Sequence, residues 1–129
     1  MIYIIDSHAW IEYLIGSAQG SLVKRILSQK SAKCITLECC ISELKGFCIR
    51  EKYNFSRVYK VVKGKSYILP VLIDQWIKAA DIKAELRVKK PTFGLIDAIL
   101  IAKQMEVSAK IVTGDPHFKG LKKVVFIGT

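Results

Sequence analysis

Four acidic residues lie where their side chains could do chemistry together. Asp6 and Asp115 each come just past the end of a short apolar run. Asp97 lies in the first turn of a predicted helix, and Glu43 lies about two turns into a different predicted helix. A carboxylate among apolar neighbours needs a partner or a metal ion, because a buried unpaired charge is strongly disfavoured. We therefore treat these four acids as the candidate catalytic and metal-binding residues.

Each acid also has a simpler structural explanation. Asp6 could be the N-cap of the helix that follows it. Asp97 could cap free amides and complement the helix dipole, and Asp115 precedes a proline, which is a common way to open a helix. Glu43 could be a surface residue paired with a nearby lysine. Taken one at a time, these positions do not distinguish capping from catalysis.

The joint pattern favours a metal site. In a parallel sheet the carboxyl ends of the strands lie on one edge, so Asp6 and Asp115 should be neighbours there. Several carboxylates on one edge would repel each other and titrate as a group. A hard divalent cation such as Mg²⁺ or Mn²⁺ relieves this repulsion. The hydroxyls of Ser7 and Thr113 could support the carboxylates or a bound water, or they could simply cap helices.

Strands and helices alternate along the chain. The predicted strands are residues 1–5, 33–36, 66–71, 109–113 and 124–127. The predicted helices are 8–15, one capped by Ser17 or Ser21, 37–52, a basic helix or helical turn over 54–65, 74–89 and 95–106. This alternation predicts an α/β fold, a three-layer α/β/α sandwich on a mostly parallel sheet of about five strands. The first strand is apolar without strict alternation, so we expect it in the centre of the sheet.

The charge of the chain points to a polyanionic partner. Its 129 residues carry 21 Lys and Arg against 11 Asp and Glu, a net charge of +10. Basic residues gather between positions 45 and 65, with aromatic residues among them, and Lys45, Arg50, Lys52 and Arg57 are candidates for RNA binding. Cations on phosphates and rings on bases suit a single-stranded nucleic acid. A solvated helix face above a few core aromatics explains the pattern equally well.

Other classes fit the sequence poorly. No apolar run approaches the roughly 18 residues of a membrane span, and the beginning of the sequence lacks the basic region of a secretory signal, so we expect a cytoplasmic protein. The four cysteines form no CxxC pair, which argues against a structural zinc site and for reduced, buried thiols. The two histidines, His8 and His117, could transfer protons, although packing or solvent exposure explains them more simply.

Taken in order, the motifs around the acids resemble a known family. The sequence is similar to the PIN-domain family, and within it to the VapC-like ribonuclease toxins of type II toxin–antitoxin pairs. The resemblance covers the whole chain, 1–129, as a single PIN-like nuclease domain. It rests on Ile4-Ile5-Asp6-Ser7, Ile41-Ser42-Glu43-Leu44, Ala84-Glu85-Leu86-Arg87 with Phe93-Gly94-Leu95-Ile96-Asp97-Ala98, and Thr113-Gly114-Asp115-Pro116-His117-Phe118.

This resemblance implies a metal-dependent endoribonuclease that uses Asp6, Glu43, Asp97 and Asp115. It also implies a homodimer and an antitoxin protein that blocks the active groove. The family often carries a further acid two residues after the position of Asp115. Here that position holds His117, so the resemblance leaves open whether a second metal ion binds.

Three other functions remain compatible with parts of the sequence. A non-catalytic nucleic-acid-binding protein would use the acids only as caps, and a PIN-like housekeeping protein would process RNA without an antitoxin. A phosphoryl-transfer enzyme would use Asp6 as a nucleophile. Dehalogenase-type phosphatases need a second Asp two residues later, where this chain has His8. A phospho-receiver would want its acceptor Asp at the end of a middle strand, but the third predicted strand ends in Leu69-Pro70-Val71.

Overall fold

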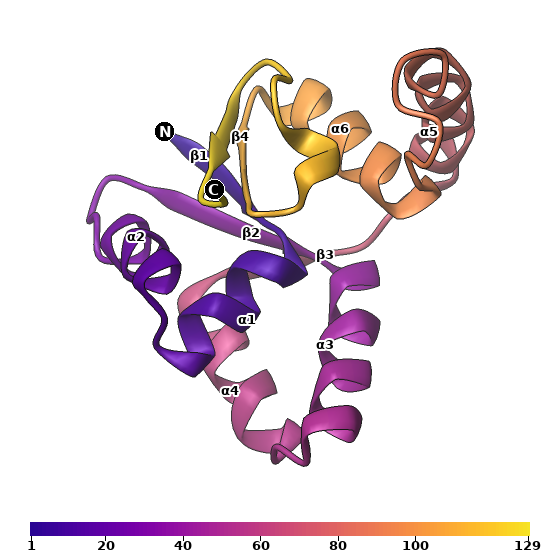
Figure 1. Ribbon diagram of the computed structural model, residues 1–129. Coiled ribbons are helices and arrows are strands. Elements are labelled where there is room, and N and C mark those ends of the chain that lie inside the picture. Colours follow the sequence, from indigo (N-terminus) through magenta and orange to yellow (C-terminus); the bar gives the residue numbers. More distant parts are fainter.

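The computed structural model describes residues 1–129, and its strands form one parallel sheet (Figure 1). The strands are β1 (Ile2–Ile5), β2 (Lys33–Leu37), β3 (Tyr67–Leu69), β4 (Lys110–Thr113) and β5 (Val124–Phe126). Their order is β3-β2-β1-β4-β5, and every neighbouring pair is parallel. The predicted fold class is confirmed, and β1 is the central strand.

Helices connect the strands close to the predicted boundaries. They are α1 (Ser7–Ile15), α2 (Ala18–Leu27), α3 (Glu38–Glu51), α4 (Phe55–Lys65), α5 (Ile73–Leu86) and α6 (Leu95–Val107), with a 3-10 turn η1 (Pro116–Phe118). Of the two predicted caps for α2, Ser17 is the N-cap, and its hydroxyl accepts the amide hydrogen of Gly20 at 3.0 Å. No helix is long and apolar enough to cross a membrane.

Helices cover both faces of the sheet and create two cores. Side chains alternate between the faces of a strand, so neighbouring residues of β1 enter different cores. Ile4 packs with the buried residues of α5 and α6, whereas Tyr3 and Ile5 pack with α1, α2 and Val62 of α4. Figure 1 shows α5 and α6 on one side of the sheet and α1, α2 and α4 on the other. Because both faces are covered, β1 is apolar throughout its length.

The third strand is shorter than the predicted 66–71. Ser66 is the C-cap of α4, and its backbone amide donates to the carbonyl of Val62 at 3.0 Å. At the other end, the amide of Val71 donates to the carboxylate of Glu38 at 2.9 Å. Side-chain and capping contacts thus occupy the backbone at both ends, and only Tyr67–Leu69 pairs with β2.

Helices α1 and α2 meet closely at Gly20. A Cβ atom on Gly20 would overlap the backbone carbonyl of Glu12 and come within 2.9 Å of the Cα of Tyr13. The glycine is therefore needed for the two helix backbones to approach each other. This contact holds α1, the helix that begins directly after Asp6, against α2 on the side of the sheet where Tyr3 and Ile5 are packed.

Candidate metal centre

The carboxyl end of β1 carries Asp6 into a buried position. The backbone continues the sheet by one hydrogen bond, in which the amide of Asp6 donates to the carbonyl of Val112 at 3.1 Å. The residue is only 4% exposed. Both oxygens of its carboxylate are engaged: the Thr113 hydroxyl donates to Oδ2 at 2.7 Å, and the Ser7 amide donates to Oδ1 at 2.8 Å. Burial and two donors from separate strand ends fix the direction of this side chain.

Glu43 reaches the same site from α3. The hydroxyl of Ser7 donates to Glu43 Oε1 at 3.0 Å and lies 3.4 Å from Asp6 Oδ1, so Ser7 joins the two acids. The lysine partner considered from the sequence is absent, since none of the ion pairs involves Glu43. Both predicted supporting hydroxyls, Ser7 and Thr113, thus contact acids rather than solvent.

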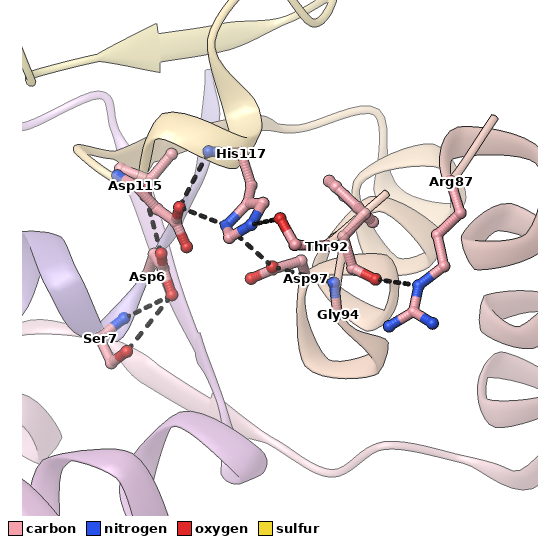
Figure 2. Close-up of polar contacts among 10 residues, drawn as sticks. Asp6, Ser7, Arg87, Thr92, Gly94, Asp97, Asp115 and His117 are labelled. Atoms are coloured by element: carbon pink, nitrogen blue, oxygen red, sulfur yellow. Dashed lines mark hydrogen bonds and ion pairs between the residues drawn. The ribbon is translucent and has the colours of Figure 1, made fainter. Parts of the chain in front are cut away.

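Asp97 and Asp115 lie near Asp6, together with His117 (Figure 2). The imidazole Nδ1 of His117 lies 2.8 Å from Asp115 Oδ1 and 3.8 Å from Asp97 Oδ2. Thr92 Oγ1 lies 2.8 Å from the other ring nitrogen, Nε2. Asp97 Oδ2 also accepts the amide hydrogen of Gly94 at 3.4 Å, a long bond that leaves the carboxylate weakly satisfied.

The acids influence one another electrostatically. Burial raises the pKa of Asp6 from 3.8 to about 6; the Thr113 hydrogen bond opposes this rise, and the charge of Glu43 adds to it. Burial also raises the pKa of Asp97 to about 6, with further contributions from Asp115 and Asp6. The pKa of Glu43 is raised, first by burial and then by the charges of Asp97 and Asp115. The four carboxylates therefore form one electrostatic group.

Capping and clustering occur together in this site. Asp6 is the N-cap of α1, Asp115 is the N-cap of η1, and Asp97 accepts from the amide that precedes α6. Helix N-termini converge on the same edge as the strand ends, so a side chain that caps one helix can still face its neighbours. The two explanations of the acids are thus compatible.

Two sets of metal-ligating atoms are present at this edge. Asp6, Cys40 and Glu43 each offer one atom within 4.8 Å of the other two, and so do Asp97, Asp115 and His117. Cys40 was not expected in the site, because it comes from the buried face of α3 and its role depends on the helix phase. All four cysteines are free. Cys34, Cys40 and Cys48 are buried as predicted, whereas Cys39 is only partly buried.

His117 and Thr92, like Cys40, are members of the site outside the predicted set of site residues. The position of His117, two residues after Asp115, is the available signal in the sequence, although packing or solvent exposure explains a histidine there more simply. Thr92 is brought in by the turn before α6 and carries no motif of its own. The other histidine, His8, belongs to neither set of ligating atoms. Its ring lies against Gly114, where an added Cβ would overlap it.

The basic stretch 45–65 forms the end of α3 and the whole of α4. The four candidate residues of this stretch are exposed: Lys45, Arg50, Lys52 and Arg57. The Nζ atom of Lys45 lies 4.9 Å from the ring centroid of Phe55, which is stacked on Tyr59. These two rings are half-buried and engaged with each other, so the exposed cations are the more available groups for a nucleic acid. RNA binding here stays a prediction.

A separate hollow lies away from the acidic edge of the sheet. A cavity of about 540 Å³ lies between the C-terminal parts of α5 and α6, and its lining includes Ile82, Met105 and Lys122. None of the four clustered acids lines it. Its only ionisable groups are Glu85, Lys122 and Lys123, so the chemistry of the molecule is concentrated at the carboxyl edge of the sheet.

Comparisons with known proteins give a family and a fold. The sequence model of the PIN domain family matches residues 3–124. No curated protein matches the sequence. A toxin–antitoxin complex from Klebsiella pneumoniae shares the fold at a TM-score of 0.77 and 14% identity, covering 97% of each chain. VapC20 from Mycobacterium tuberculosis, described as a sarcin–ricin loop cleaving toxin, superposes with a TM-score of 0.73 at 16% identity, over 95% of this chain and 96% of that chain.

A third structure extends the same comparison. VapBC2 from Rickettsia felis, bound to a DNA fragment from its promoter, has a TM-score of 0.75 at 15% identity, over 98% of this chain and 97% of that chain. At such low identities the likeness is one of fold. It extends over almost the full length of both chains.

Proposed function

The chain belongs to the PIN-domain family, and from this we propose that it is a metal-dependent endoribonuclease acting as the toxin of a toxin–antitoxin pair. The observation that carries the proposal is the convergence of Asp6, Glu43 and Asp97 on one edge, with the pKa of each raised. Burial and mutual repulsion disfavour the ionised form of these three carboxylates. A cation bound between them would offset this cost.

The donor set fits a divalent cation. Asp6 and Asp97 would be the principal ligands, with Glu43 next and Asp115 holding the ion or its water. Carboxylate oxygens suit Mg²⁺ or Mn²⁺, and the raised pKa values of Asp6 and Asp97 are the expected result of crowding buried acids without a cation. A bound ion of this kind lowers the pKa of water and offsets the negative charge of a phosphodiester.

The surrounding residues have supporting roles in this proposal. Thr113 and Ser7 hold the carboxylates of Asp6 and Glu43 in fixed directions through hydrogen bonds of 2.7 to 3.0 Å. Lys45, Arg50, Lys52 and Arg57 would bind the phosphates of RNA; Lys45 is two residues from Glu43 on α3. We expect water to attack phosphorus in line, leaving products with a 5′-phosphate and a 3′-hydroxyl.

The partners follow from the family and the neighbouring structures. Two of the similar folds come from toxin–antitoxin assemblies, which supports an antitoxin as partner for this chain. We extend the proposal to a homodimer that acts on RNA in the cytoplasm. An antitoxin that covers the acidic edge would hold the nuclease inactive until it is removed.

The central experiment is cleavage of end-labelled RNAs with Mg²⁺, with Mn²⁺ and with EDTA. We expect cleavage with either ion, none with EDTA, and none by the folded variant Asp6→Asn. Circular dichroism should show that the variant keeps its fold. Equal cleavage by wild type and Asp6→Asn, or cleavage that survives EDTA, would contradict the proposal.

One alternative function has an observation in its favour. The caps made by Asp6, Asp97 and Asp115 would suit a non-catalytic nucleic-acid-binding protein, in which these acids only stabilise helices. That alternative predicts that folded Asp97→Asn keeps whatever nuclease activity the preparation has. A housekeeping RNA-processing enzyme would instead lose activity in this variant but lack a small neighbouring reading frame for an antitoxin.

A further inference from the structure

His117 adds a nitrogen donor to a site otherwise built from oxygen atoms. Its Nδ1 lies 2.8 Å from Asp115 Oδ1 and 3.8 Å from Asp97 Oδ2, and one donor atom from each of the three residues lies within 4.8 Å of the other two (Figure 2). Asp115 and His117 lie at the start of η1, and Asp97 lies in the first turn of α6. The buried rings of Phe118 in η1 and Phe93 just before α6 pack edge to face, with ring centroids 5.8 Å apart.

The ring of His117 is oriented from several directions. Its backbone amide donates to Asp115 Oδ1 at 2.9 Å, which fixes the one-turn helix that carries the ring. The ring centroids of Phe93 and His117 lie 6.2 Å apart, and the two rings are nearly perpendicular, with an interplanar angle of 87°. Thr92 Oγ1 lies 2.8 Å from Nε2. The imidazole is therefore held with Nδ1 facing the two carboxylates.

The threonine has a specific chemical consequence. An imidazole can bind a cation through Nδ1 only if the ring proton is on Nε2, and a hydrogen-bond acceptor at Nε2 favours that tautomer. The hydroxyl of Thr92 can accept this proton. It can equally donate to Nε2 when Nδ1 carries the proton and donates to Asp115, so the pair suits both states of the site.

This inference rests on the proposed function. We propose that His117 is a specificity-determining residue, and that Asp97, Asp115 and His117 form a nitrogen-containing half of the metal centre. This half favours Mn²⁺ or Co²⁺ over Mg²⁺, because imidazole suits first-row transition ions whereas Mg²⁺ prefers oxygen ligands. Thr92 is a positioning residue, because its hydrogen bond to Nε2 holds the ring of His117 with Nδ1 facing the two carboxylates.

The chain offers a direct spectroscopic test, because it has only two histidines. Untagged protein loaded with Mn²⁺ should show the ¹⁴N modulation of a coordinated imidazole in pulsed electron paramagnetic resonance. The signal should vanish in His117→Asn and persist in the matched variant His8→Asn. Absence of nitrogen coupling in the Mn²⁺-loaded wild type, or its persistence in His117→Asn, would overturn the proposal.

Calorimetry of the same proteins tests the selectivity. We expect His117→Asn to weaken the binding of Mn²⁺ and Co²⁺ by about tenfold or more, and the binding of Mg²⁺ by less than about threefold. Thr92→Val should lose a smaller part of the Mn²⁺ affinity, and Thr92→Ser should restore it. His117→Asp should shift the preference toward Mg²⁺.

The outcomes separate this inference from the function on which it rests. If the wild type binds neither Mn²⁺ nor Mg²⁺ and cleaves no RNA, the proposed nuclease itself is wrong. If it binds both ions and cleaves RNA, but His117→Asn weakens Mn²⁺ and Mg²⁺ equally, then His117 does not set the selectivity. The nuclease proposal would survive that second result.

Discussion

The Thr113 hydroxyl donates to Asp6 Oδ2 at 2.7 Å, a bond that spans 107 positions of sequence and joins the ends of the neighbouring strands β4 and β1. Thr113 is fully buried, and its oxygen also accepts the amide hydrogen of Asp115 at 3.0 Å. One side chain thus positions two of the four acids. It does so from the strand that also carries the backbone into Asp115.

Replacing Thr113 with Val should therefore affect both stability and metal binding. The change leaves the Asp115 amide and Asp6 without their partner, so we expect a loss of about 1–3 kcal/mol in the free energy of unfolding. It also removes the hydrogen bond that lowers the pKa of Asp6, so the carboxylate should ionise less readily and bind Mn²⁺ more weakly. Urea unfolding and Mn²⁺ titration of the same samples measure the two effects.

Thr113→Ser is the matched control, because it keeps the hydroxyl and loses only a methyl group. We expect it to retain most of the metal affinity of the wild type. If the valine and serine variants bind Mn²⁺ equally, the hydroxyl does not position Asp6, and the 2.7 Å contact has only a packing role.

The raised pKa values predict how the metal-free protein responds to pH. The pKa of Asp6 and of Asp97 is about 6 in the folded state, against 3.8 ordinarily. The unfolded chain therefore releases these protons first, and the two groups make the folded state less stable as pH rises from about 4 to about 6. The rise in the pKa of each residue lowers the free energy of unfolding at neutral pH by at most about 3 kcal/mol.

Asp97→Asn should remove its share of this pH dependence. In EDTA, the variant should equal the wild type near pH 4 and become more stable than it above about pH 6, as measured by urea unfolding at several pH values. The exposed Asp81→Asn on α5 is the control and should change stability by less than about 0.5 kcal/mol at any pH. A loss of several kcal/mol in Asp97→Asn without metal would instead identify Asp97 as a satisfied structural group.

The basic stretch can be tested through the salt dependence of RNA binding. In a catalytically inactive Asp6→Asn background, the added pair Lys45→Ala and Arg57→Ala should weaken the binding of single-stranded RNA. The slope of log affinity against log salt should fall by about 0.7 for each lost phosphate contact. Fluorescence anisotropy at several salt concentrations gives both quantities.

A charge-matched pair elsewhere controls for net charge. Lys24→Ala with Lys122→Ala removes the same two charges from exposed positions outside the stretch 45–65. We expect a smaller change in slope for this pair. Equal effects of the two pairs would mean that RNA responds to the overall charge of +10 and that α3 and α4 form no specific binding surface.

Two glycines should respond in opposite ways to alanine. Gly20→Ala places a Cβ against the Glu12 carbonyl, so we expect the two helices to separate and the free energy of unfolding to fall by about 1–3 kcal/mol. Gly64→Ala in α4 meets no atom within 4 Å and should stabilise the exposed helix by about 0.5–1 kcal/mol. Thermal unfolding of both variants compares the two effects, and a neutral Gly20→Ala would show that α1 and α2 can shift without cost.

Much of the fold could be predicted from the sequence because it depends on periodic patterns. The alternation of strands and helices identified the sheet, and the continuous apolar character of residues 2–5 placed β1 in its centre. The short extent of β3 could not be predicted. The end of this strand depends on the Glu38 carboxylate of α3, which accepts the hydrogen bond from the backbone amide of Val71.

Some residues of the site could also be predicted from the sequence, and others could not. Asp6 and Asp115 were predictable as neighbours, because strand ends of a parallel sheet share an edge. The position of the His117 side chain could not be predicted. It depends on the conformation of the three-residue turn η1 and on a hydrogen bond to Thr92, which precedes α6. Such irregular segments have no period from which a side-chain direction can be inferred.

The position of β1 in the sheet also determines when the site can form during synthesis. The first strand lies between β2 and β4, and its contact with β4 closes a loop of more than a hundred residues. Contacts between such distant segments form late, since the loop must be ordered first. A growing chain carries Asp6 from its earliest residues, but it cannot complete the acidic centre until Thr113 and Asp115 have emerged from the ribosome. The order of translation therefore places completion of the acidic centre near the end of synthesis.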